Sequence, residues 1–163
     1  MRRLTLMLLL CACDRPETAR IDPAEPQARA EEVAAPPFVV VDATPAAGPL
    51  EAQLRAHVQR ARIRRLRPFA ELGATWCPPC RAIEQSMDDP LMRTAFRGTY
   101  IVRIDIDELG RELGPLGLSA PAIPKFIELR DDGHGSGRAI DGSAWGEDIP
   151  ANMAPVLDRY FHF

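Results

Sequence analysis

Two cysteines in the middle of the chain have a spacing suited to disulfide chemistry. They lie in the stretch Trp76-Cys77-Pro78-Pro79-Cys80, which follows a β-prone run and precedes a helical pattern. Two cysteines separated by two residues at such a junction lie on the first helical turn. They are then close enough to form a disulfide that closes a small ring. The spacing therefore predicts a Cys77–Cys80 redox pair.

The position of Cys77 predicts that it is the reactive thiol. Unpaired backbone N–H groups and the helix dipole favour an anion at a helix N-terminus. They lower the pKa of a thiol from its usual value of about 8.5, so part of it is thiolate at neutral pH. The thiolate is the attacking species in disulfide exchange. Cys80, one turn deeper, is predicted to be the better shielded cysteine and to resolve a mixed disulfide. Pro78 and Pro79 restrict the backbone between them.

The same two cysteines have two other interpretations. A CxxC pair can be half of a zinc site, but sites with four ligands normally need a second pair. The histidines His57, His134 and His162 show no ligand spacing. A static structural disulfide is the other alternative, and it explains poorly why the pair lies between a strand and a helix, directly after a tryptophan.

The chain from residue 38 onward shows the alternating elements that would position the pair. Strand patterns cover 38–41, 68–72, 100–106, 125–129 and 138–140, and helical patterns cover 50–61, 83–96, 108–116 and 149–160. This order predicts a layered α/β domain. Apolar residues make up 46% and charged residues 26% of 163, enough for one core. A net charge of −3 gives no reason to expect nucleic acid as a partner.

The stretch Gly-Ala-Thr-Trp-Cys-Pro-Pro-Cys-Arg, which ends at Arg81, resembles the active-site motif of the thioredoxin superfamily. Glu71 stands six residues before Cys77, where that family has a buried acidic residue. Ile123-Pro124 precedes a predicted strand, where the family has its cis-proline loop. The resemblance covers 38–163 and is strongest to periplasmic thioredoxin-like reductase domains of bacteria. It implies the thioredoxin fold: a central mixed β-sheet flanked by helices, with the CxxC at a helix N-terminus and the cis-proline loop opposite.

The resemblance also implies a role for each of these residues. Cys77 would attack a disulfide, Cys80 would release the product, and Glu71 would exchange a proton with Cys80. Trp76, Ile123 and Pro124 would contact the substrate, with Pro78 and Pro79 in the active-site loop. No organic cofactor or metal is expected. The expected partners are disulfide-containing client proteins and an upstream thiol–disulfide electron donor, and a monomer is expected.

Two residues of this region depart from the family pattern. Lys125 follows the expected cis-proline where threonine is usual, and 119–122 lengthen the preceding loop. Pro121 in that loop competes with Pro124 for the cis bond, but the position directly before the strand favours Pro124. These departures affect substrate preference rather than the chemistry.

The N-terminus has the layout of a secretory signal: Met1-Arg2-Arg3, then an apolar run over 4–10, too short to span a bilayer. Leu10-Cys11-Ala12-Cys13 resembles the bacterial lipoprotein box, which implies cleavage before Cys13 and a lipid on its sulfur. The expected organisation is a signal peptide at 1–12, a Pro/Ala/Glu-rich disordered tether at 13–37 and a thioredoxin-like domain at 38–163. An ordinary signal peptide cut later, or a short buried N-terminal segment, is the alternative.

Together these features predict a protein-disulfide reductase of the bacterial cell envelope, anchored to a membrane only by lipid and facing the periplasm. A thiol oxidase or isomerase is the alternative within the same chemistry. A non-catalytic protein that uses the fold to hold a metal or a partner is the alternative from another class.

Overall fold

The computed structural model describes residues 38–163. The predicted signal peptide at 1–12, the lipid-bearing Cys13 and the tether at 13–37 lie outside the described residues. None of the helices in the described part of the chain is both long and apolar enough to cross a membrane.

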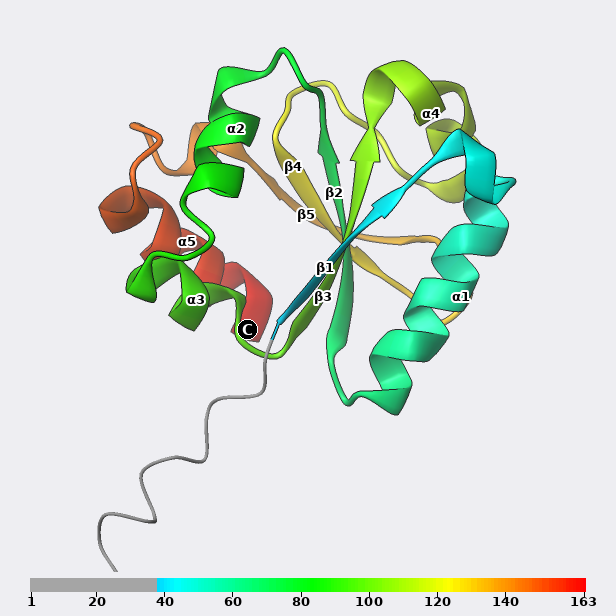
Figure 1. The fold of residues 1–163 in the computed structure, drawn as a ribbon, viewed down its shortest axis with the longest axis horizontal. Helices are drawn as coiled ribbons and strands as arrows, with labels where there is room; N and C mark the ends of the chain where they lie inside the picture. Colours follow the sequence, from blue (N-terminus) through cyan, green and yellow to red (C-terminus); the bar gives the residue numbers. More distant parts are fainter. Residues whose placement is uncertain (1–37) are drawn as a thin grey trace, which may run out of the picture. The chain divides into compact units, whose positions relative to one another are not determined.

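Five strands form one mixed sheet in the order β1-β3-β2-β4-β5 (Figure 1). Their bounds are Val39–Ala43 (β1), Arg67–Gly73 (β2), Thr99–Asp105 (β3), Lys125–Leu129 (β4) and Gly135–Asp141 (β5). β1 and β2 both run parallel to β3, whereas β4 pairs antiparallel with β2 and with β5. β2 is the central strand, so the segment that follows it emerges from the middle of the sheet.

Helices cover both faces of the sheet. Their bounds are Leu50–Ile63 (α1), Pro78–Gln85 (α2), Pro90–Phe96 (α3), Ile106–Leu113 (α4) and Pro150–His162 (α5). α1 and α4 pack on one face, with Leu54 and Leu109 in the same apolar cluster as Leu72 of β2. α2, α3 and α5 pack on the other face, where Ile83 and Phe161 share a cluster with Phe69 (Figure 1). Alternation along β2 therefore points Phe69, Glu71 and Gly73 toward α2.

The strands and helices predicted from the pattern are all present, with shifted boundaries. The helical pattern over 83–96 is two helices rather than one. α2 ends at Gln85, and the Asp89 side chain accepts a hydrogen bond of 2.8 Å from the N–H of Leu91 to begin α3 at Pro90. Likewise Asp105 ends β3 and accepts 2.8 Å from the N–H of Asp107, so α4 begins earlier than predicted.

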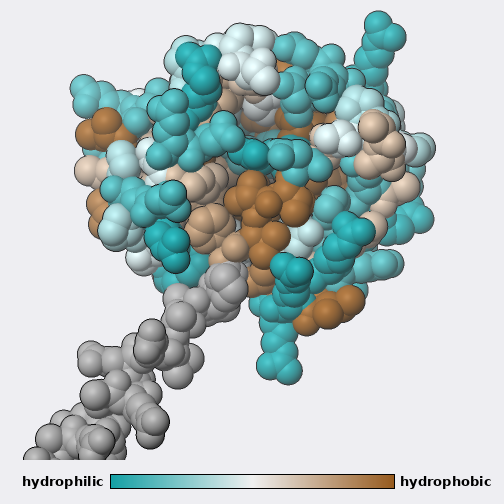
Figure 2. Space-filling model, in the orientation of Figure 1, coloured by the Kyte–Doolittle hydropathy of each residue, from teal (hydrophilic) through white to brown (hydrophobic). Residues whose placement is uncertain are grey.

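β1 is an edge strand, and the face of the molecule that presents it is partly apolar. Val39, Val40 and Val41 are half-buried. Figure 2 shows the corresponding hydrophobic patch over β1, surrounded by polar side chains. The opposite edge of the sheet belongs to β5, which is the more exposed strand.

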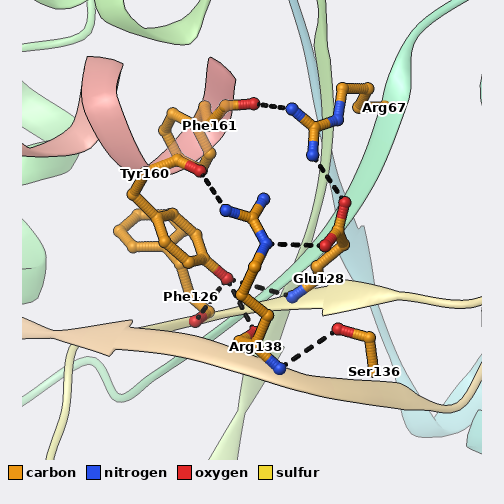
Figure 3. A network of polar contacts seen from close by, with 7 residues as sticks. All are labelled: Arg67, Phe126, Glu128, Ser136, Arg138, Tyr160 and Phe161. Atoms are coloured by element: carbon orange, nitrogen blue, oxygen red, sulfur yellow. Dashed lines mark hydrogen bonds and ion pairs between the residues drawn. The ribbon is translucent and has the colours of Figure 1, made fainter. Parts of the chain in front are cut away.

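A polar network joins α5 to the antiparallel side of the sheet (Figure 3). Glu128 of β4 accepts hydrogen bonds of 2.7 Å from both Arg67 and Arg138. The Tyr160 hydroxyl accepts from the N–H of Glu128 at 3.1 Å and lies 2.8 Å from the Arg138 carbonyl. The β4–β5 register shifts between Ile127 and Leu129, and the Tyr160 hydroxyl satisfies the backbone at that irregularity.

We predict that Tyr160→Phe lowers the free energy of unfolding by about 1–3 kcal/mol, because it leaves the N–H of Glu128 without its partner. Tyr100→Phe is the matched control, since the Tyr100 hydroxyl has a single side-chain partner, Nδ1 of His57 at 2.9 Å. Urea denaturation of both variants measures the two losses. An equal or larger loss in Tyr100→Phe would show that the hydroxyl of Tyr160 does not support the irregularity.

Candidate functional site

Cys77 and Cys80 form a disulfide at the start of α2, with their Cα atoms 5.3 Å apart. Cys77 is the residue before the first helical turn and has an extended backbone, and Pro78 occupies the first helical position. Proline suits this position, because its fixed φ is helical and the N–H it lacks would have no partner within the helix. The sequence Cys-Pro therefore fixes the residue at which α2 begins.

The N-terminus of α2 is directed at the sulfur of Cys77. The backbone N–H of Cys80 donates a hydrogen bond of 3.2 Å to Sγ of Cys77. Such a bond, together with the helix dipole, stabilises a thiolate on Cys77 once the disulfide is opened. This geometry agrees with the sequence-based argument that Cys77 is the more acidic thiol.

The prediction that Cys80 is the better shielded cysteine is wrong. Cys77 is 2% exposed, whereas Cys80 is half-buried. Gly73 is the reason, because it leaves the space beside Cys80 open: a Cβ at Gly73 would stand 3.4 Å from Sγ of Cys80. The position of a cysteine along the helix therefore does not determine its exposure here, since Cys80 faces a glycine at the end of β2.

The peptide bond between Ile123 and Pro124 is cis, as predicted, and the competing Pro121 bond is not. Lys125 of β4 pairs with Leu72 of β2, so Pro124 lies beside the C-terminal end of β2. From the same end of β2 the chain continues to Cys77. Pro124 is buried and Ile123 half-buried.

Trp76, which follows the same end of β2, is a large hydrophobic side chain that is 60% exposed. Its indole Nε1 donates a hydrogen bond of 2.7 Å to the carboxylate of Asp107 in α4. The ring is thus held in place while much of its surface remains free. An exposed, oriented aromatic ring directly before Cys77 is suited to contact a bound chain.

Glu71 is buried in the middle of β2, as predicted, and is 5% exposed. Its Oε2 atom has no hydrogen-bond partner. Burial raises the pKa of Glu71 to about 7, because a carboxylate loses its hydration there, and the positive charge of Arg103 opposes that rise only in part. The carboxyl is therefore able to gain or lose a proton near neutral pH.

Arg103 was not singled out from the sequence. It pairs with Glu71 in the register of β2 and β3. Its guanidinium donates hydrogen bonds of 2.7 Å and 3.2 Å to Asp42 of β1 and one of 2.7 Å to Glu84 of α2. The available signal was an arginine among the apolar residues Ile101, Val102 and Ile104 of β3.

A cavity of about 470 Å³ lies beneath α2. It is lined by Glu71, Gly73, Cys80, Glu84 and Arg103, among others, while Cys77, Ile123 and Pro124 do not line it. The cavity therefore does not extend to the cis-proline. Glu71 and Cys80 share one water-accessible space, which is the arrangement a proton exchange between them requires.

Residues 38–163 contain no group of three or more His, Cys, Asp or Glu side chains placed to hold a metal ion. His57 is bonded to Tyr100, His162 lies 3.2 Å from the carbonyl of Ala95, and His134 lies beside Asp132 in the β4–β5 turn.

We predict that Glu71→Gln stabilises the oxidised protein increasingly as pH rises. The folded-state pKa of about 7 lies above the ordinary value of 4.5, so folding holds a proton that the unfolded chain releases. Wild-type stability is then lost as pH rises from about 4.5 to about 7, by on the order of 2–3 kcal/mol. Glutamine at position 71 removes that loss. Urea denaturation at pH 4.5 and pH 8 measures it.

Glu147→Gln, at an exposed position, is the control and should change stability equally at both pH values. A pH-independent effect of Glu71→Gln would contradict the raised pKa of the buried carboxyl.

Comparison with known proteins finds partial similarities. No family model matches the chain. A stretch of 63 residues, 39% of the chain, is 32% identical to "Thioredoxin Asp f 29" of Aspergillus fumigatus and spans 56% of that protein.

Among solved structures, the chain is similar to a disulphide isomerase from Xylella fastidiosa (20% identity, TM-score 0.47, covering 68% of this chain and 86% of that one). It is also similar to oxidised thioredoxin O2 from Arabidopsis thaliana (22%, TM-score 0.45, covering 77% and 96%). The strand order, the disulfide at the start of α2 and the cis-proline before β4 are those of the thioredoxin fold, and the chain has that fold.

Proposed function

We propose that this chain is a thiol–disulfide oxidoreductase of the thioredoxin superfamily that reduces disulfides in partner proteins. The observation that carries the proposal is the Cys77–Cys80 disulfide at the N-terminus of α2, with the N–H of Cys80 directed at Sγ of Cys77. A disulfide at this position joins a thiolate-stabilising helix end to a second cysteine one turn away. A purely structural disulfide needs neither feature.

The reaction begins from the reduced pair. The thiolate of Cys77 attacks one sulfur of a client disulfide, and the other client sulfur leaves with the electron pair and takes a proton. The thiol of Cys80 then attacks Sγ of Cys77, and the second client thiol departs. The client gains two electrons and two protons, and the Cys77–Cys80 disulfide is re-formed.

Glu71 serves the second step of this reaction. The thiol of Cys80 must lose its proton to attack, and Glu71 lines the same cavity as Cys80 with a pKa of about 7. A carboxylate with that pKa accepts the proton at neutral pH and returns it in the reverse reaction. Glu71 is thus the general base for resolution of the mixed disulfide.

The client binds at the C-terminal end of β2. Trp76 supplies an exposed ring directly before Cys77, and the segment Ile123-Pro124 lies at the same end of the sheet. The segment before the cis-proline contacts the client backbone.

The electrons come from an upstream thiol–disulfide protein. The reducing direction is proposed on the resemblance of 38–163 to bacterial reductase domains, supported by the partial identity to a protein named as a thioredoxin. The location is proposed on the sequence of the first 13 residues: Cys13 carries a lipid, and residues 13–37 tether the domain to a membrane of the bacterial cell envelope.

We expect the reduced chain to reduce the disulfides of insulin and Cys77→Ser to have no such activity, since the attacking thiolate is lost. Cys80→Ser should accumulate mixed disulfides with client proteins, because it attacks but cannot resolve. Insulin precipitation and non-reducing gels measure the two effects. Loss of activity only in Cys80→Ser, with trapping by Cys77→Ser, would reverse the assigned roles.

We expect Cys13→Ser to abolish acylation and to release the protein from membranes into the soluble fraction. Cys11→Ser is the matched control, because Cys11 leaves with the signal peptide and its loss should not affect anchoring. Membrane fractionation and mass measurement of the mature N-terminus check both variants. A soluble wild type, or a mature N-terminus beyond residue 13, would overturn the anchor.

A further inference from the structure

The disulfide is accessible from the side of the cavity, and the cysteine on that side is Cys80. Cys80 lines the cavity of about 470 Å³ beneath α2, and Cys77 does not. Gly73 lines it too, with no side chain between the end of β2 and Cys80: a Cβ at that position would stand 3.4 Å from Sγ of Cys80. A molecule in the cavity therefore contacts Cys80, which is half-buried, while Cys77 is 2% exposed and is not part of the lining.

Attack from the cavity would also have the better leaving group. A thiolate that attacks Sγ of Cys80 expels the sulfur of Cys77, which accepts the N–H of Cys80 at 3.2 Å at the start of α2. The thiol with the lower pKa leaves faster in disulfide exchange. Accessibility and leaving-group stability thus both favour attack on Cys80 with Cys77 as the leaving group.

The charge of the cavity selects among the molecules that can enter. Its lining includes the carboxyl-bearing residues Asp42, Glu71, Glu84, Asp105 and Glu108, against Arg81 and Arg103. The pairs of Arg103 with Asp42 and Glu84 compensate charge on both sides, and even with the full charge of Arg81 counted the carboxyl residues outnumber the arginines. A negative cavity concentrates cations and repels anions. Its volume admits a thiol of a few heavy atoms but not a folded client.

We propose that this cavity is an entry site for small cationic thiols, which open the disulfide at the sulfur of Cys80 rather than at that of Cys77. The entering thiolate forms a bond to Sγ of Cys80, and the Cys77–Cys80 bond breaks to leave a thiolate on Cys77. A second small thiol then releases the first as a small-molecule disulfide. Both cysteines are thereby reduced, and the two electrons come from the two small thiols.

This proposal goes beyond the proposed function, because it concerns a route that protein clients do not use. The test reduces the oxidised full chain with three thiols of similar size: cysteamine (cationic), 2-mercaptoethanol (neutral) and 2-mercaptoethanesulfonate (anionic). Each rate is expressed per thiolate and divided by the rate with bis(2-hydroxyethyl) disulfide, which removes intrinsic differences in nucleophilicity. We expect cysteamine to exceed the sulfonate by at least roughly tenfold at low salt and the ratio to shrink in 1 M NaCl.

The site of attack is read from the first adduct. After acid quenching and alkylation, fragmentation of the peptide that ends at Arg81 places the small thiol on Cys80 or on Cys77. We expect it on Cys80 in the majority of the adduct. An adduct mainly on Cys77, or equal corrected rates for the three thiols, would overturn the proposal.

Two variants with matched controls connect the effect to the cavity. Glu108→Gln should lower the cysteamine-to-sulfonate ratio, while Glu147→Gln, outside the cavity, should not. Gly73→Ala should slow all three thiols several-fold by covering Sγ of Cys80. Gly114→Ala, where a Cβ meets nothing within 4 Å, should leave the rates unchanged. A Gly73→Ala protein that reacts like wild type contradicts entry through the cavity.

These outcomes are separable from those of the proposed function. A chain that fails to reduce insulin but shows the charge order and the Cys80 adduct loses the proposed function and keeps this route. A chain that reduces insulin but forms its adduct on Cys77 keeps the function and loses the route.

Discussion

The hydrogen bond from the N–H of Cys80 to Sγ of Cys77 is the interaction on which the site depends. It requires α2 to begin directly after Cys77, which Pro78 ensures by its fixed φ and its missing N–H. The site also requires α2 to follow the central strand, because there the neighbouring strands bring other functional groups to the same end of the sheet. The strand order therefore determines which groups surround the start of α2.

Burial and charge compete at Glu71, and burial prevails. The register of β2 and β3 sets Arg103 beside Glu71, and such a cation alone would lower the pKa of the carboxyl. Arg103, however, donates its hydrogen bonds to Asp42 and Glu84. Its charge is therefore largely compensated by two other carboxylates, and desolvation decides the pKa of Glu71. Because Arg103 is paired with Asp42 and Glu84, Glu71 titrates near neutral pH.

The sequence carried the fold and most of the site in local signals. Hydrophobic periodicity located the helices and strands, and the Trp-Cys-x-x-Cys motif with Glu71 and Ile123-Pro124 located the site and the cis bond, because each depends on a few adjacent residues. The start of α3 was indicated in the sequence by Asp89, a capping residue before Pro90, but the apolar pattern continued across the gap between the two helices.

The relative exposure of the two cysteines could not be predicted from such local signals. It depends on how Gly73, the first residue of the motif, packs against Cys80, and on the space between α2 and the ends of three strands. Arg103 likewise gains its meaning only from the register that sets it beside Glu71 and within reach of α2. Long-range pairing of this kind leaves no local pattern.

The two sulfurs of the disulfide consequently have different surroundings, and this difference gives the site a direction. Sγ of Cys77 accepts the backbone N–H of Cys80, which stabilises negative charge, whereas Cys80 faces a cavity that contains a carboxyl able to accept its proton. Stabilising a thiolate on Cys77 makes it both the better attacking group at neutral pH and the better leaving group. Access to water and to Glu71 makes Cys80 the cysteine whose proton can move. A symmetric pair would lack this division, because each step of exchange needs one sulfur to carry charge while the other gains or loses a proton.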